Sequence, residues 1–354
     1  MIRSMPLNEF LSEYTERNVD NEYRPVAVGR YGIRSRDGIY SKELAKDYSK
    51  NKLIFKNTLT IGMGSVQIDI GILSTDETYS VSPAYHTYRI NGINPNYLRH
   101  CLECRNQDMF VRYVKKGSRQ GKTIDLSRWL TYEIPVCSIE DQEKIVDKID
   151  RVQGIIDASE KQLVKLDELV KSRFVEMFGD PLKNDKDFPT VPGEALFKLS
   201  NGKALPNNKR FTVGIPAYGG NGISWYTDEI LCDYNTIIIG RVGFQSGNVQ
   251  LAKAPLWVTD NAMYISWINK KECDIRFLCS LMEHIDFKRY QDAGDLKKIT
   301  QKPFMQMHYL MPSMSLQKRY IAFVAEIDKS KLAVQQSLEK LETLKKSLMQ
   351  RYFG

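Results

Sequence analysis

Residues 163–172 read LVKLDELVKS, and residues 338–347 read LEKLETLKKS. The two stretches match at an offset of 175 residues, and Phe178-Gly179 recurs at the same offset as Phe353-Gly354. In both stretches apolar residues return every three or four positions, which is typical of a helix with one apolar face. The 354-residue chain therefore reads as a duplication with two copies, too few for a solenoid.

Upstream of these stretches the match loosens and its offset grows. Residues 57–62 (NTLTIG) match residues 235–240 (NTIIIG) at 178, and residues 29–33 match residues 219–223 at 190. Each copy is thus predicted to be a variable globular region followed by a better-matched helix. Strand-like and helix-like runs alternate in the globular regions, which predicts mixed α/β structure. The strand-like runs are 58–61, 79–90, 236–239 and 257–268, and the helix-like runs are 96–114 and 275–290.

The two helical segments are predicted at about residues 138–178 and 316–352. Ser138 and Asp141 resemble a capping box, and Gly179-Asp180-Pro181 is a strong stop signal. Gly154 costs about 1 kcal/mol in a helix interior and weakens the prediction of an unbroken helix. Apolar residues form a seam along one face of each predicted helix. They are Ile145, Ile149, Val152, Ile156, Leu163, Leu166 and Val170 in the first helix, and Val324, Ile327, Val334, Leu338, Leu341 and Leu348 in the second.

A sustained seam requires another apolar surface. The helices pack either on their own globular regions or against each other, and their equal length and repeat position favour the second arrangement. The expected fold is α+β: two globular domains, residues 1–136 and 180–312, separated by an antiparallel two-helix coiled-coil spacer with pseudo-twofold symmetry. The spacer helices occupy residues 137–179 and 313–354, and the C-terminus is expected near the first globular domain.

Charge is unevenly distributed among these four segments. The whole chain carries a net charge of +8, and the segments carry +5, −3, +2 and +4 in chain order. The globular domains hold +7 of the total, which favours a polyanionic partner such as DNA.

Candidate DNA-binding residues are basic or amide side chains on glycine-rich loops and turns, because such side chains bind phosphates and read base edges. Isolated polar surface residues are common, so each candidate alone is a weak signal. In the first domain they are Arg30, Arg34, Arg36, Lys115, Lys116, Arg119 and Lys122; in the second they are Tyr218, Asn221, Arg241, Gln245, Lys297 and Lys298.

The chain has no evident catalytic or metal-binding signature. Phosphate-loop, dinucleotide-binding, zinc-protease and nucleophile-elbow motifs are all missing. Its six cysteines include one close pair, Cys101 and Cys104, without the partners that a zinc site needs, so reduced thiols are expected. Neither a membrane-spanning run nor a signal peptide is recognisable. These patterns predict a cytoplasmic, non-catalytic protein without a cofactor of its own.

The helical segments resemble those of the DNA-specificity subunits of type I restriction-modification systems. The residues that carry the resemblance are Ile134-Pro135, Asp141-Gln142 and residues 166–181 in the first copy, and Met311-Pro312, Leu316-Gln317, residues 327–330 and residues 341–353 in the second. The resemblance covers the whole chain in layout but is specific only in the helices. Leu316 stands where the first copy has Asp141, so the two helices need not bind a partner identically.

The resemblance implies that each globular domain is a target recognition domain for one half of a bipartite, asymmetric DNA sequence. The helices set the gap between the halves and dock two methyltransferase (modification) subunits. S-adenosylmethionine, ATP and Mg²⁺ then belong to the modification and restriction (endonuclease and translocase) subunits. The competing hypotheses are a coiled-coil scaffold that does not bind DNA, and a nuclease or methyltransferase with degraded motifs.

Overall fold

The computed structural model describes residues 2–37, 47–116, 121–292, 294 and 297–354. The chain folds into two compact units. Unit 1 comprises Met1–Glu160 and Gln336–Gly354, and unit 2 comprises Lys161–Gln335. Each unit combines sheets, short helices and one part of each of two 40-residue helices, α3 (Ile139–Phe178) and α7 (Met314–Phe353). The predicted α+β class with two domains is therefore confirmed.

Unit 1 is built on a four-stranded antiparallel sheet of order β2-β9-β6-β7, on which α1 packs. A separate hairpin, β3-β4, covers β7, and the pairs β5-β8, β10-β11 and β1-β12 complete the unit. The elements are β1 (Arg3–Pro6), η1 (Leu7–Glu9), β2 (Leu11–Glu13), β3 (Val26–Gly29), β4 (Gly32–Ser35), β5 (Lys52–Ile54), β6 (Thr58–Met63), β7 (Ile68–Ile72), β8 (Tyr79–Val81), β9 (His86–Ile90), α1 (Pro95–Tyr113), β10 (Val114–Lys116), β11 (Lys122–Ile124), α2 (Leu126–Trp129) and β12 (Glu133–Val136).

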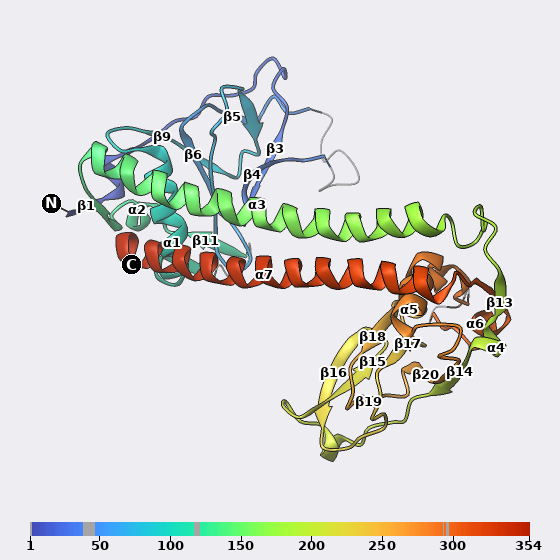
Figure 1. The fold of residues 1–354 in the computed structure, drawn as a ribbon. Helices are drawn as coiled ribbons and strands as arrows, with labels where there is room; N and C mark the ends of the chain where they lie inside the picture. Colours follow the sequence, from blue (N-terminus) through green and yellow to red (C-terminus); the bar gives the residue numbers. More distant parts are fainter. Residues whose placement is uncertain (1, 38–46, 117–120, 293, 295–296) are drawn as a thin grey trace. The chain divides into compact units, whose positions relative to one another are not determined.

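Unit 2 repeats this plan. Its four-stranded sheet has the order β14-β20-β17-β18, with α5 against β18 and β17, and its hairpin β15-β16 adds β19 in parallel (Figure 1). The elements are β13 (Thr190–Pro192), α4 (Gly193–Leu196), β14 (Phe197–Asn201), η2 (Asn207–Lys209), β15 (Ile215–Gly219), β16 (Gly222–Thr227), β17 (Thr236–Gly240), β18 (Val249–Ala252), β19 (Trp257–Val258), β20 (Ala262–Ile268), α5 (Ile275–Ile285), η3 (Phe287–Tyr290), α6 (Lys302–Gln306) and β21 (His308–Leu310).

Three predicted runs are interrupted. The strand predicted over 79–90 is two strands, β8 and β9, because Ser82-Pro83-Ala84-Tyr85 forms a turn closed by the Tyr85 N–H donating to the Ser82 carbonyl. The strand predicted over 257–268 divides into β19 and β20 at a turn in which the Ala262 N–H donates to the Thr259 carbonyl. The helix predicted over 275–290 ends at Ile285, because Asp286 has a left-handed backbone with φ of 54°.

Both long helices extend over their predicted lengths. Ser138 caps α3 by accepting the Asp141 N–H, and Gly179, with φ of +73°, ends it. Gly154 does not interrupt the helix. The helix α7 begins two residues before its predicted start. All thirteen seam residues are buried or half-buried.

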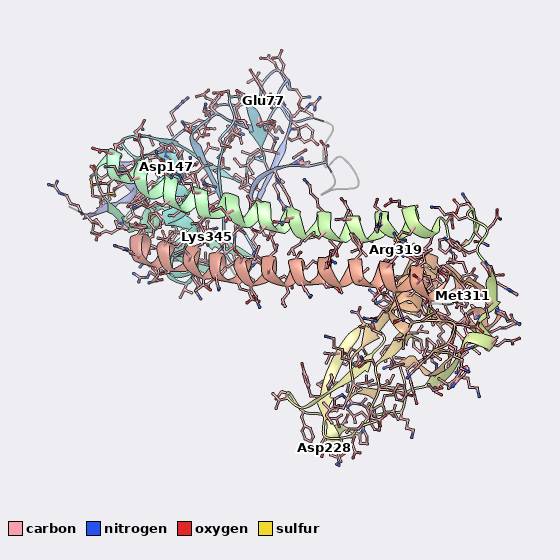
Figure 2. All side chains as sticks on the ribbon, in the orientation of Figure 1. Glu77, Asp147, Asp228, Met311, Arg319 and Lys345 are labelled. Atoms are coloured by element: carbon pink, nitrogen blue, oxygen red, sulfur yellow. The ribbon has the colours of Figure 1, made fainter. Side chains whose placement is uncertain are left out.

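Within each unit, the parts of α3 and α7 run antiparallel and contact each other. In unit 1, Lys345 of α7 (Figure 2) donates to the Gln153 side chain at 2.5 Å, and Phe353 joins a core with Ile149. In unit 2, Lys331 forms an ion pair with Asp167, and Tyr320 packs edge-on against Phe178. Lys331 and Lys345 interrupt the apolar seam, and in the structure each of them finds a polar partner on α3.

Candidate nucleic-acid interface

Unit 2 gathers its predicted DNA-binding residues around the end of β17. The loop 241–247 follows β17, and residues 297–299 lie beside it. The Gly243 N–H donates to the Lys297 carbonyl at 2.8 Å, and the Ile299 N–H donates to the Arg241 carbonyl at 3.0 Å. Arg241, Gln245, Lys297 and Lys298 therefore lie on two adjoining segments, and the Lys298 side chain is exposed.

The tip of the hairpin β15-β16 joins the same place. A Cβ on Gly220 would lie 3.4 Å from the Gly240 Cα and 3.3 Å from the Asn261 carbonyl oxygen, so the tip presses directly on the end of β17. Asn221 stands at this tip and Tyr218 precedes it. Burial raises the pKa of the Tyr218 hydroxyl, which keeps it a neutral hydrogen-bonding group. The structure thus brings together all six residues predicted in the second domain.

Unit 1 places its predicted lysines in the corresponding position. Lys122 begins β11, and its ammonium donates to the carbonyl of Ser65, in the turn after β6, at 2.5 Å. Lys115 pairs with Asp125 at 2.5 Å, and this hydrogen bond lowers the pKa of the Asp125 carboxyl. Lys116 pairs in register with Lys122 across the β10-β11 hairpin. Arg119 lies outside the described residues.

The predicted arginines of unit 1 form a separate group. Arg30, Arg34 and Arg36 line a cavity of about 1020 Å³ on the β3-β4 hairpin. Arg24 and Arg99 line it too, and neither was predicted from the sequence. The carbons Cζ of Arg30 and Arg34 lie 5.7 and 5.1 Å from the centre of the Tyr31 ring, a geometry typical of cation–π contacts. This cavity is a second cationic surface of the unit.

Two exposed apolar side chains also belong to these loops, and neither was predicted from the sequence. Phe244, in the loop after β17, is 83% exposed, and Val66, in the turn after β6, is 61% exposed. They align at the offset of 178 that relates residues 57–62 to residues 235–240, and Gln67 aligns with Gln245 in the same way. Extending that match by five residues pairs Val66 with Phe244, but only the structure shows that both side chains are exposed.

Each unit ties its long helix to its sheet-covering helix by one buried glutamine. Gln142, on the first turn of α3, accepts the N–H of Asn94, the N-cap of α1, at 2.8 Å and donates to the Cys137 carbonyl at 2.9 Å. Gln317, on the first turn of α7, accepts the N–H of Asp274, the N-cap of α5, at 2.9 Å and donates to the Glu272 and Pro312 carbonyls. These residues stabilise the geometry of the units and lie outside the cationic loops.

The cysteines are free thiols in the structure, and burial raises the pKa of Cys101 and of Cys273 to about 12. In the part of the chain that the structure describes, no three His, Cys, Asp or Glu side chains are grouped closely enough to hold a metal ion. Nor does any helix of the described residues combine the length and apolarity needed to cross a bilayer.

Known proteins are similar to this chain in sequence. A family model described as a type I restriction modification DNA specificity domain matches residues 13–168. The EcoprrI type I restriction enzyme specificity subunit of Escherichia coli is 27% identical over 114 residues, which cover 32% of this chain and only 27% of that protein. The putative type I restriction enzyme MjaX specificity subunit of Methanocaldococcus jannaschii is 23% identical over 287 residues, 73% of this chain and 67% of that protein.

Two solved structures share the fold over nearly the whole chain. The S subunit of a type I restriction-modification system from M. genitalium matches with a TM-score of 0.63 and 14% identity, covering 100% of this chain and 96% of that one. A chain from a study of complex assembly and conformational transition in a type I restriction-modification system matches with a TM-score of 0.61 and 16% identity, covering 99% and 97%. The family match of residues 13–168 and the shared fold confirm the resemblance of this chain to the specificity subunits of type I restriction-modification systems.

Proposed function

We propose that this chain selects the DNA sequence on which a type I restriction-modification complex acts. Unit 1 reads one half of a bipartite, asymmetric target and unit 2 reads the other. The division of the chain into recognition domains 1–136 and 180–312 and spacer helices 137–179 and 313–354 is part of this proposal. The complex acts on DNA in the cytoplasm.

One observation carries the proposal. In both units a lysine-bearing segment lies against the turn that follows the same central strand, β6 or β17. The side chains on these turns differ between the units, since Arg241 and Phe244 of unit 2 stand where unit 1 has Met63 and Val66. Repeated cationic segments suit two contacts with phosphates, and different side chains suit two different half-sites.

The helices α3 and α7 set the gap between the half-sites and dock two methyltransferase subunits. Those subunits supply the S-adenosylmethionine-dependent methylation of adenine, and restriction subunits supply ATP- and Mg²⁺-dependent translocation and cleavage. The alternative of a coiled-coil scaffold that ignores DNA is disfavoured by the DNA-specificity family model that matches residues 13–168.

Methylome sequencing tests the proposal. Cells that carry the modification subunits receive either this chain or a variant in which residues 180–312 come from another specificity subunit. We expect a bipartite methylated motif with this chain, and a motif in which one half changes with the variant. An unchanged motif in both strains would show that the chain does not select the sequence.

A further inference from the structure

Phe244 occupies an unusual position for an exposed aromatic residue. It is 83% exposed, more than any other large apolar side chain among the described residues. Its neighbours on the same loop are Arg241 and Gln245, and the adjoining segment carries Lys297 and Lys298. One exposed apolar side chain on adjoining segments that carry cations and an amide does not resemble the apolar core of a protein–protein interface.

The loop that carries Phe244 is held rigidly. Hydrogen bonds close it at its base, where the Gly240 N–H donates to the Asn248 carbonyl and the Gly247 N–H donates to the Gly240 carbonyl, both at 2.8 Å. The Gln291 amide donates to the Ser246 carbonyl at 2.5 Å and, at 3.4 Å, to the Phe244 carbonyl. The backbone at the tip is therefore fixed while its side chain projects into solvent. A preorganised loop loses little conformational entropy on binding.

The corresponding turn of unit 1 has the same design with a smaller side chain. Val66 is 61% exposed and precedes Gln67, as Phe244 precedes Gln245. The Gly64 N–H donates to the Gln67 carbonyl at 3.1 Å, and Lys122 donates to the Ser65 carbonyl at 2.5 Å. The duplication has thus left an exposed apolar residue beside a lysine at the same place in both units.

We propose that Phe244 inserts between two adjacent base pairs of the half-site read by unit 2 and unstacks them. This inference rests on the proposed function. Apolar side chains that wedge into a base step kink the duplex and favour steps that unstack easily, so they contribute to sequence selection. The surrounding cations bind the flanking phosphates. Val66 is too short to unstack a step, so distortion is confined to the half-site of unit 2.

The test uses the full chain in complex with its methyltransferase subunits, after methylome sequencing has given the motif. Duplexes carry 2-aminopurine in place of successive bases of the unit 2 half-site, and its fluorescence rises when stacking is lost. We expect the wild-type complex to raise the fluorescence at one step, and Phe244→Ala to abolish that rise. Phe244→Ala should also weaken binding to the motif by roughly tenfold or more, while binding to unrelated duplexes is unchanged. Phe244→Leu should retain part of both effects.

Val213→Ala is the matched control. Val213 is 76% exposed in the same unit, but it precedes β15, at the opposite end of the hairpin from Asn221. We expect wild-type fluorescence and affinity from this variant. A Phe244→Ala complex that behaves like Val213→Ala would overturn the insertion while leaving the motif, and so the proposed function, intact. Loss of methyltransferase subunits from the Phe244→Ala complex would overturn the insertion and would show instead that Phe244 contacts a methyltransferase subunit. If the wild-type complex methylates no bipartite motif, the proposed function fails instead.

Discussion

Gln142 and Gln317, 175 residues apart, make equivalent hydrogen bonds in the two units. Each lies on the first turn of a long helix, is at most 1% exposed, and accepts the N–H of the residue that caps the helix packed on the sheet. The amide of each also donates to backbone carbonyls near the start of its own helix. One residue type thus fixes the angle between two helices twice in the same chain.

Replacing either glutamine by alanine should destabilise its own unit. In Gln142→Ala the Asn94 N–H and the Cys137 carbonyl lose their partners, and buried polar groups left unpaired cost about 1–3 kcal/mol each. Urea unfolding monitored by hydrogen exchange in each unit measures the effect. Gln162→Ala, at an exposed position of the same helix, should change stability by less than about 0.5 kcal/mol. Equal effects of Gln142→Ala and Gln162→Ala would contradict the structural role of Gln142.

The last residue of each long helix, α3 or α7, packs into the core of the unit that contains that end of the helix. Phe353 is fully buried and packs on Tyr97 in unit 1, and Phe178 packs on Phe277 in unit 2, both with ring centres 5.0 Å apart in edge-on geometry. Phe353→Ala should cost about 3–5 kcal/mol in unit 1. Hydrogen exchange should then accelerate in α1 but not in α5. The matched variant Phe178→Ala should give the reverse pattern, and faster exchange of α5 in Phe353→Ala would refute the assignment.

Unit 2 should lose stability on mild acidification because of His284. Burial lowers the pKa of its imidazole from the ordinary value of 6.5, and its ring stacks on Phe174 with centres 3.8 Å apart. Below pH 6.5 the unfolded chain binds a proton that the folded chain does not, so the free energy of unfolding falls until the folded-state pKa is passed. Burial raises the pKa of the neighbouring Glu283 carboxyl. Protonation of Glu283 therefore stabilises the folded unit as the pH falls, which opposes the effect of His284.

The melting temperature between pH 7.5 and 5 measures this dependence. His284→Phe should flatten the decrease below pH 6.5, since phenylalanine preserves the stacking and cannot bind a proton. His308→Gln, at an exposed position of the same unit, removes a histidine without removing the buried one and should leave the slope as it is. A slope that is the same in His284→Phe and the wild type would rule out His284 as its source.

The cationic segments should act through phosphates. Lys298→Ala should weaken binding of the complex to every duplex, and the slope of log affinity against log salt should become shallower by about one. Lys270→Ala is the control, because Lys270 is also exposed but follows β20 at the end remote from Ala262, which pairs with Gly240. Fluorescence anisotropy at four salt concentrations distinguishes them. An identical slope for both variants would show that residues 297–299 do not contact the DNA phosphates.

The sequence predicted the parts of the fold that depend on periodicity. The seam and the flanking signals at Ser138 and Gly179 place α3, since spacing and capping are local properties. The turns at Ser82–Tyr85 and Thr259–Asn261 were missed, because apolar residues on both sides make the runs look continuous. The cluster around Gly240 could not be predicted, since it needs Gly220, Arg241 and Lys297 from three separate segments. Phe244 was overlooked because an exposed aromatic residue is recognisable only once its surroundings are known.

A proline in the middle of α3 tests whether the helix sets the gap between half-sites. Leu163 is a half-buried seam residue in the middle of α3. Leu163→Pro removes a main-chain hydrogen bond and introduces a steric clash, at a cost of about 3 kcal/mol or more. The cores around Phe353 and Phe178 lie at the ends of the helices, so each unit should stay folded while the distance between the half-sites ceases to be fixed. Methylome sequencing should then find the bipartite motif lost or its gap variable, whereas Leu163→Met, which keeps the seam and the helix, should preserve it. A wild-type gap in Leu163→Pro would mean that something other than a continuous α3 sets the spacing.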